Sequence, residues 1–129
     1  IGIPDHILLK PGRLSPDEFE VMKRHSQIGA AILSGGESPL VTMAEVIARS
    51  HHERWDGTGY PERLTAEAIP FPARVVAIAD VFDALTHERP YRAALPLQDV
   101  LLEIDRQAGR HFDPQLTESF RTLPHRELV

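Results

Sequence analysis

Helical periodicity interrupted by proline and glycine is the feature that most restricts the fold of this chain. No alternation of apolar and polar residues extends beyond about three residues, which argues against β-strands. Apolar residues instead recur at helical spacing, in segments separated by turns that draw on 11 prolines and 8 glycines. We therefore predict an all-α fold: a helical bundle of about five helices, with a long Gly/Pro loop after the second.

Capping signals indicate where these helices begin and end. Ser15 precedes Pro16, and Glu18 follows three residues after the serine, which is the pattern of a capping box. The apolar stripe that begins there is expected to end at Gly35 and Gly36. The other expected helices cover about residues 39–52, 72–90, 97–108 and 113–123, and the long loop covers residues 53–72.

Length and composition favour one globular domain. The chain has 129 residues, of which 42% are hydrophobic, and it has no cysteine for disulfides or thiolate metal ligands. A formal net charge of −5 argues against a protein that coats a nucleic-acid polymer. No apolar run approaches the roughly 20 residues that span a bilayer. We expect a cytoplasmic chain without membrane contact. Because it begins with Ile1 inside an apolar run, we expect a piece of a longer protein.

Four side chains are candidate metal ligands, because they interrupt or border the apolar stripes of three expected helices. His25 lies within the first stripe, His51 continues the buried face of the second helix, and His52 follows directly. Adjacent helical residues point about 100° apart, so neighbouring imidazoles are expected to face two different ions. Asp80 lies in the apolar segment VVAIADVFDAL, where an unpaired buried carboxylate costs several kcal/mol. Histidine and carboxylate donors suit Mn, Fe, Zn or Ni.

Each of these residues also has an ordinary structural explanation. His25 alone could be a hydrogen-bonded histidine of a helix. Asp80 alone could cap a helix, or pair with Arg74 or Arg92. Spacing by itself leaves both explanations open.

The loop and the segment ERPYR offer a second kind of site. Gly57 and Gly59 could serve a tight turn, or could let the backbone approach a phosphate. Tyr60 offers a ring for base stacking. Arg89 and Arg92 offer guanidinium groups that suit phosphate oxygens, or they could be solvated surface charges.

The stretch HHERWDGTGYP, residues 51–61, resembles the HHExxDGxGYP signature of the HD-GYP domains, a branch of the HD metal-dependent phosphohydrolases. The resemblance extends through residues 1–33, 69–92 and 109–116, and therefore covers nearly the whole chain to about residue 120. It implies a helical bundle of the HD-domain type and hydrolysis of cyclic di-GMP. It also implies two or three metal ions, with iron or manganese favoured over zinc and nickel.

The resemblance implies roles for individual residues. The HD dipeptide of the family and the lysine after it would lie before Ile1, so no catalytic residue beyond the metal ligands is expected in this chain. The implied metal ligands are His25, His51, His52 and Asp80.

The implied substrate contacts lie farther along the chain. Tyr60, Arg89 and Arg92 correspond to positions where the family contacts the cyclic dinucleotide. The signature loop comprises Glu53, Asp56, Gly57, Gly59, Tyr60 and Pro61.

We therefore expect a single domain over residues 1–129, the C-terminal portion of an HD-GYP domain whose intact form is a metal-dependent cyclic di-GMP phosphodiesterase. One alternative is a non-catalytic module that binds cyclic di-GMP, or docks a partner such as a diguanylate cyclase through the Gly-Tyr-Pro loop. Another is a nucleotide phosphohydrolase of the wider HD superfamily, which explains the metal residues but not the Gly-Tyr-Pro turn. Formation of a homodimer could cover apolar faces left open by absent helices.

Overall fold

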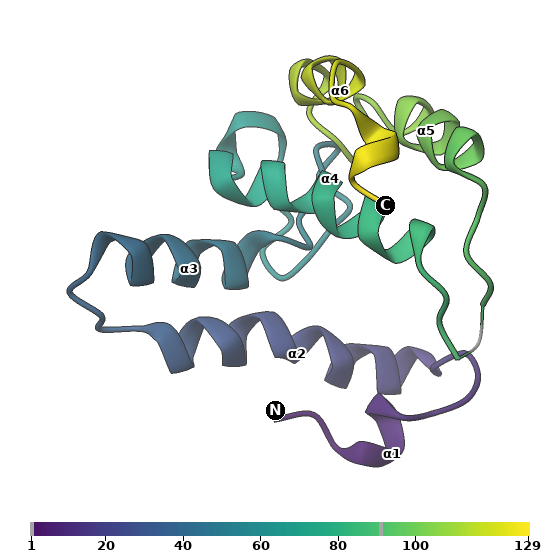
Figure 1. Ribbon diagram of the computed structural model, residues 1–129. Coiled ribbons are helices and arrows are strands. Elements are labelled where there is room, and N and C mark those ends of the chain that lie inside the picture. The colour runs from purple at the N-terminus through teal and green to yellow at the C-terminus, as the bar shows by residue number, and fades with distance from the viewer. Residues whose placement is uncertain (1, 91) are drawn as a thin grey trace.

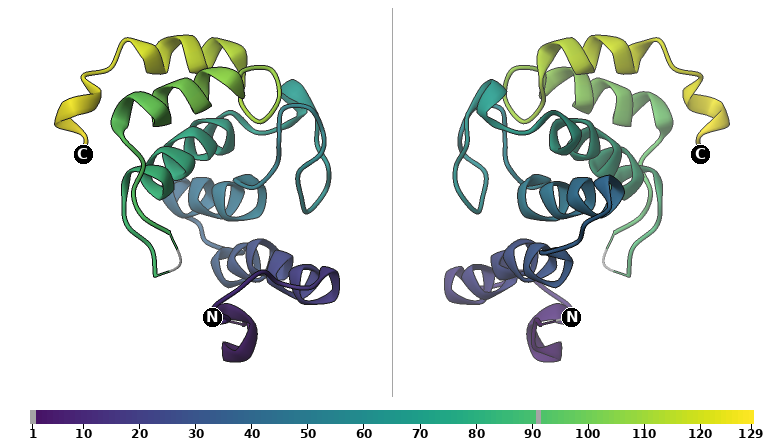
Figure 2. Two further views of the ribbon diagram at one scale, coloured as in Figure 1. Left: turned by 90° about the vertical axis from the view of Figure 1, so that its right-hand side faces the viewer. Right: turned by 90° about the vertical axis from the view of Figure 1, so that its left-hand side faces the viewer.

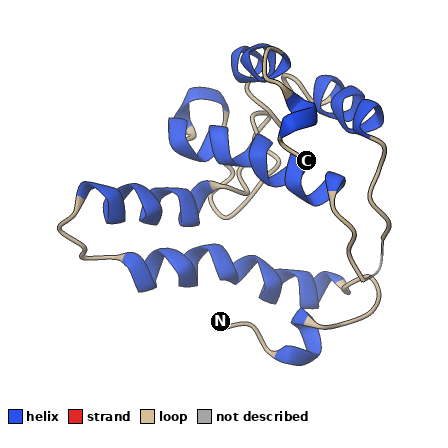
Figure 3. Ribbon diagram, in the orientation of Figure 1, coloured by secondary structure: helices blue, strands red, loops and turns tan. Residues whose placement is uncertain are grey.

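The computed structural model describes residues 2–90 and 92–129, which form helices joined by loops (Figures 1 and 3). The described residues contain isolated β-bridges but no strand, so the all-α prediction is confirmed. The elements are α1 (Asp5–Leu8), α2 (Pro16–Leu33), α3 (Pro39–Ser50), η1 (Ala66–Ala68), α4 (Phe71–Thr86), α5 (Leu97–Arg106), α6 (Pro114–Arg121) and η2 (His125–Glu127).

Helices α2 and α3 form a hairpin that lies below α4 in Figure 1, and α5 and α6 pack against the other side of α4. The short helix α1 packs on α2. None of the helices over the described residues has the length and apolar character needed to cross a membrane. The buried core lies between α4, α5 and the start of α6, and consists of Ala77, Ile78, Phe82, Val100, Ile104 and Phe112.

The helix starts follow the local signals of the sequence. The Ser15 hydroxyl accepts a hydrogen bond from the Glu18 amide at 3.1 Å, and the Glu18 carboxylate accepts one from the Ser15 amide at 2.9 Å. This confirms the capping box. At the start of α6, the carboxylate of Asp113 accepts a hydrogen bond from the amide of Gln115 at 2.9 Å.

The helix ends agree less well with the sequence predictions. Helix α3 ends at Ser50 with His51 as its C-cap, and α4 ends at Thr86, before the proline that was expected to close it. Helix α1 was not among the five predicted helices; it is a single turn without a side-chain cap, so it carries little sequence signal. The predicted long loop contains one short 3₁₀ turn, η1.

Helix α4 is covered by α3 on one side and by α5 and α6 on the other, but part of its surface stays open. Val75 is 42% exposed, and Ala79 is also exposed. The same is true of Asp80, so the expectation of a costly buried carboxylate at this position is wrong. The reason is that α5 and α6 cover one side of α4 and leave the side chain of Asp80 in contact with solvent.

An ion pair between α4 and α6 joins the two halves of the fold. The guanidinium of Arg74 donates to the carboxylate of Asp113 at 2.7 Å, and the two side chains are 15% and 5% exposed. Arg74 also donates to the carbonyl of Ile69 at 3.0 Å and lies over the ring of Trp55. This pair therefore fixes the end of the long loop as well as α6.

We predict that Asp113→Asn lowers the free energy of unfolding by about 3 kcal/mol, because the substitution keeps a capping oxygen but leaves a buried guanidinium without its partner charge. Urea unfolding followed by circular dichroism measures the change. The control is Asp105→Asn, which breaks an exposed pair with Arg121 and should cost about 1 kcal/mol or less. Equal losses in both variants would contradict the assigned role of the buried pair.

Candidate metal centre

Three imidazoles converge where α2 faces the C-terminal end of α3. His25 comes from the middle of α2, and His51 and His52 directly follow α3. One ligand nitrogen from each ring lies within 4.8 Å of the others, and all three side chains are half-buried. The ring centroids are separated by 4.8 Å for His25 and His52 and by 4.1 Å for His51 and His52. The structure thus brings together three of the four predicted ligands.

Backbone carbonyls orient two of these rings. Nδ1 of His25 donates to the carbonyl of Met22 at 2.7 Å, and Nδ1 of His51 donates to the carbonyls of Ile47 and Ala48 at 2.9 and 3.1 Å. Because a carbonyl can only accept, Nδ1 carries a proton in each ring, which leaves Nε2 as the nitrogen that could bind a metal. Metal-binding histidines are commonly held in this way.

The environment keeps the third imidazole neutral. Burial, together with smaller contributions from His51, His25 and His111, lowers the pKa of His52 to about 3. Neutral imidazole is the form that binds metals. Three imidazole nitrogens that share one space therefore fit a divalent transition metal.

Asp80 lies near this cluster but outside the group of three. It is exposed on α4, and its charge helps to raise the pKa of the Tyr60 phenol, which places the two side chains in the same region. Neither alternative partner pairs with it. Arg74 pairs with Asp113, and Arg92 donates to a backbone carbonyl of α4.

A buried carboxylate closes the signature loop. Glu53 is 2% exposed, and its two oxygens accept hydrogen bonds from the amides of Glu62 at 2.7 Å and Leu64 at 3.0 Å. The sequence placed Glu53 in the signature but did not indicate this function. Its role in the described structure is to hold the far side of the loop against the end of α3.

Tyr60 connects the loop to the histidines. Its ring stacks on His52 with a centroid separation of 5.0 Å, and it meets the edge of Phe19 at 6.0 Å. Burial raises the pKa of Tyr60 to about 12, with a further contribution from Asp80. The phenol therefore stays protonated near neutral pH and can donate a hydrogen bond.

The signature glycines have steric reasons to be glycine. Gly57 has φ +82°, a conformation that residues with a side chain rarely adopt. A Cβ at Gly59 would collide with backbone atoms of His52, Glu53 and Arg54. The need for a tight turn, one of the two explanations that the sequence left open, is therefore sufficient to explain both glycines.

The base of the loop is fastened to the turn between α5 and α6. The amides of Trp55 and Asp56 donate to the carbonyls of His111 at 3.1 Å and Arg110 at 2.9 Å. The carboxylate of Asp56 accepts hydrogen bonds from the amide and hydroxyl of Thr58 at 3.0 and 2.6 Å. Sequence reasoning did not connect these two segments, because no local pattern pairs them.

The predicted phosphate contacts Arg89 and Arg92 lie on the turn after α4. Their backbones exchange hydrogen bonds of 2.8 and 3.1 Å, and Arg89 also lies 3.4 Å from the carboxylate of Asp83. In Figure 2 this turn and the signature loop lie on opposite sides of the molecule. Among the described residues, no hydrogen bond or ion pair joins either arginine to Tyr60.

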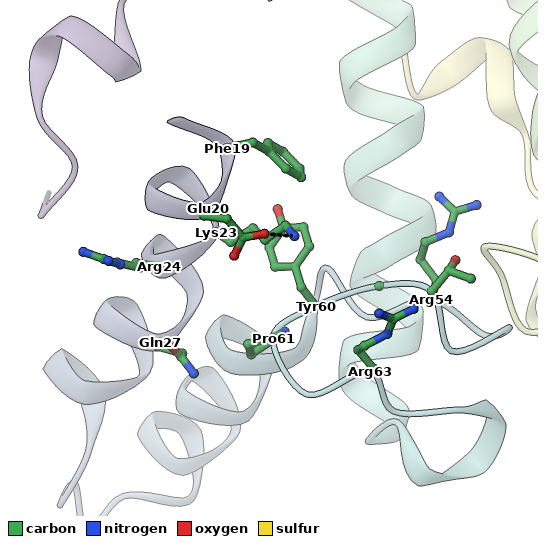
Figure 4. A pocket seen from close by; sticks show the side chains of 11 residues that line it. Phe19, Glu20, Lys23, Arg24, Gln27, Arg54, Tyr60, Pro61 and Arg63 are labelled. Atoms are coloured by element: carbon green, nitrogen blue, oxygen red, sulfur yellow. Dashed lines mark hydrogen bonds and ion pairs between the residues drawn. The ribbon is translucent and has the colours of Figure 1, made fainter. Parts of the chain in front are cut away.

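A pocket of about 650 Å³ opens between α2 and the signature loop (Figure 4). Tyr60 forms part of its wall, but most of its lining comes from residues that the sequence did not single out. They are scattered along the chain and form no motif. The lining residues are Phe19, Glu20, Lys23, Arg24, Gln27, Arg54, Thr58, Gly59, Tyr60, Pro61 and Arg63.

Comparisons with known proteins identify the family of this chain. A family model described as HD domain matches residues 1–116. A cyclic di-GMP phosphodiesterase of Thermotoga maritima is 49% identical over 123 residues, which cover 95% of this chain and 33% of that protein. A cyclic di-GMP phosphodiesterase response regulator of Xanthomonas campestris is 50% identical over 119 residues, covering 92% and 32%. A 3′3′-cGAMP-specific phosphodiesterase of Vibrio cholerae is 45% identical over 118 residues, covering 92% and 23%.

A solved structure gives a similar result. A cyclic GMP-AMP specific phosphodiesterase of Vibrio cholerae superimposes with a TM-score of 0.63 at 28% identity, covering 87% of this chain and 26% of that one. The chain spans about a third or less of the length of these relatives.

We predict that Gly59→Ala lowers the free energy of unfolding by about 1–3 kcal/mol, because the added methyl group forces the loop away from the end of α3. Urea unfolding measures the loss. Gly12→Ala is the matched control: a Cβ at that position meets no atom within 4 Å, so stability should be nearly unchanged. A stable Gly59→Ala variant would show that the loop can move without cost.

We also predict that stability decreases as the pH falls from about 6.5 towards 4. Burial and the charge of Arg54, opposed by Asp56, lower the pKa of His111 from 6.5 to about 4. Between these values the unfolded chain binds a proton that the folded chain does not, so acid favours unfolding. His111→Gln should flatten this dependence, although His52 still contributes. Urea titrations at several pH values measure the slope, and an equal slope in the variant would contradict the prediction.

Proposed function

Because the chain belongs to the HD domain family, we propose that it forms the larger part of a metal-dependent phosphodiesterase site that hydrolyses cyclic di-GMP. The observation that carries this proposal is the convergence of His25, His51 and His52 with ligand nitrogens within 4.8 Å of one another. The relatives named as cyclic di-GMP phosphodiesterases support it, with identities of 49% and 50%.

In this proposal the ligands are the three histidines and Asp80, and the preceding HD segment completes the site. Iron or manganese suits such donors, and zinc or nickel is the alternative. When bound, the metal supplies hydroxide from water near neutral pH and polarises the phosphoryl oxygen. His51 and His52 are the proposed ligands of two different ions, a role that stays a prediction for these adjacent rings.

The chain's other residues orient the substrate. Tyr60 keeps its phenolic proton near neutral pH, so it can donate a hydrogen bond to a substrate oxygen. Glu53 holds the loop that carries Tyr60. Arg89 and Arg92 remain predicted contacts to substrate phosphate, on the side of the molecule away from the signature loop.

A second candidate substrate is cyclic GMP-AMP. A relative named for 3′3′-cGAMP is 45% identical, which is close to the identities of those named for cyclic di-GMP. Parallel assays with both cyclic dinucleotides distinguish the two. Docking of a diguanylate cyclase to the Gly-Tyr-Pro loop, and a homodimer, also remain predictions.

We predict that His51→Ala and Asp80→Ala each reduce hydrolysis of cyclic di-GMP at least a hundredfold. Removing a residue that only hydrogen-bonds a metal ligand typically costs 10–100-fold, and removing the ligand itself should cost more. Activity is measured on protein that includes the HD segment. Elemental analysis should show less metal per chain, while far-UV circular dichroism stays unchanged. His87→Ala, an exposed histidine after α4, is the control. Full activity in both ligand variants would contradict the assignment.

A further inference from the structure

We propose that the pocket between α2 and the signature loop is a nucleotide subsite that binds a phosphate through Lys23 and Arg63 and packs the rest of the nucleotide against Phe19 and Pro61. In the intact enzyme, this subsite would hold the half of the cyclic dinucleotide that is not being cleaved. That role rests on the proposed function. Its capacity to bind a nucleotide is a property of this chain alone and needs no metal.

The charge of the pocket is opposite to that of the chain. The formal net charge of the whole protein is −5, yet the pocket is lined by four cationic side chains and one carboxylate. In Figure 4, Lys23 on α2 lies across the pocket from Arg54 and Arg63 on the loop, while Arg24 points away. Cations contributed by both walls are suited to a compact anion such as a phosphate.

The two principal cations are available to a ligand. Lys23 pairs with Glu20 at 2.8 Å, but the side chain of Glu20 is 68% exposed, and pairs of this kind contribute little. Within the described part of the chain, Arg63 takes part in no ion pair with a carboxylate. Its Nε donates to the carbonyl of Gly57 at a long 3.5 Å. A phosphate can therefore replace these contacts at little cost.

The backbone of Arg63 is an independent indication. Its φ of 56° lies in the left-handed region, which is unfavourable for a residue with a long side chain. The amides on either side of it, those of Glu62 and Leu64, both donate to Glu53. The buried carboxylate thus holds Arg63 in a strained conformation at the pocket, and such strain is concentrated at ligand-binding sites.

The pocket also provides an apolar wall next to the metal centre. Lys23 lies 5.0 Å from the ring centroid of Phe19 and 5.7 Å from that of Tyr60, so its ammonium group is held between two rings. Tyr60 lines the pocket and stacks on His52. The pocket and the histidine cluster therefore share one wall, and the volume of about 650 Å³ is in the range of small-molecule sites.

Isothermal titration of this chain with GMP in EDTA tests the proposal, because the chelator removes any binding through a metal. We expect GMP to bind more tightly than guanosine, which lacks the phosphate, and more tightly than inorganic phosphate, which lacks the base. Raising the salt concentration should weaken GMP binding. Equal affinity for phosphate and GMP would overturn the assignment of a nucleotide.

Variants locate the binding. Lys23→Ala and Arg63→Asn should each weaken GMP about tenfold through loss of a charge-assisted hydrogen bond, and asparagine tolerates the backbone of position 63. Glu20→Gln should tighten binding, because it removes the one carboxylate of the pocket. Arg126→Ala, an exposed arginine of η2, should change nothing.

Two further outcomes separate this proposal from the proposed function. Binding of GMP that requires a metal, or that is unchanged in both pocket variants, overturns the subsite and leaves the phosphodiesterase assignment intact. Binding in EDTA that follows the expected pattern, together with no cyclic dinucleotide hydrolysis by protein that includes the HD segment, supports the pocket and overturns the phosphodiesterase assignment.

Discussion

The buried carboxylate of Glu53 is the interaction on which the geometry of the loop depends. A charge that is 2% exposed is costly unless hydrogen bonds replace water, and two backbone amides do so here. Those amides belong to the residues that flank Arg63, so one side chain closes the loop and sets the conformation of its apex. The stacking of Tyr60 on His52 then joins the closed loop to the histidine cluster.

The features that could be predicted from the sequence are those decided within one or two helical turns. The capping box of Ser15 and Glu18 and the Asp113 cap of α6 involve residues two or three positions apart, and the capping box forms as predicted. The orientation of His25 and His51 is local too, since each ring bonds to a carbonyl of the preceding turn. Helix ends were predicted less well, because proline and glycine mark where a helix cannot continue rather than where it stops.

The features that escaped prediction depend on contacts between distant segments. Whether Asp80 is buried depends on which face of α4 the later helices cover, and the composition of α4 does not contain that information. Arg74 finds its partner 39 residues away, at Asp113. The cations of the pocket come from α2 and from the loop, so only the folded chain brings them together around one pocket.

The three histidines come from one helical hairpin: His25 lies on α2, and His51 and His52 directly follow α3. Contacts between segments close in sequence form quickly during folding, because little chain entropy is lost in bringing them together. The packing of α2 on α3 therefore aligns the three rings without help from α5 or α6. On a ribosome, this nitrogen cluster would be assembled while the C-terminal helices were still being synthesised.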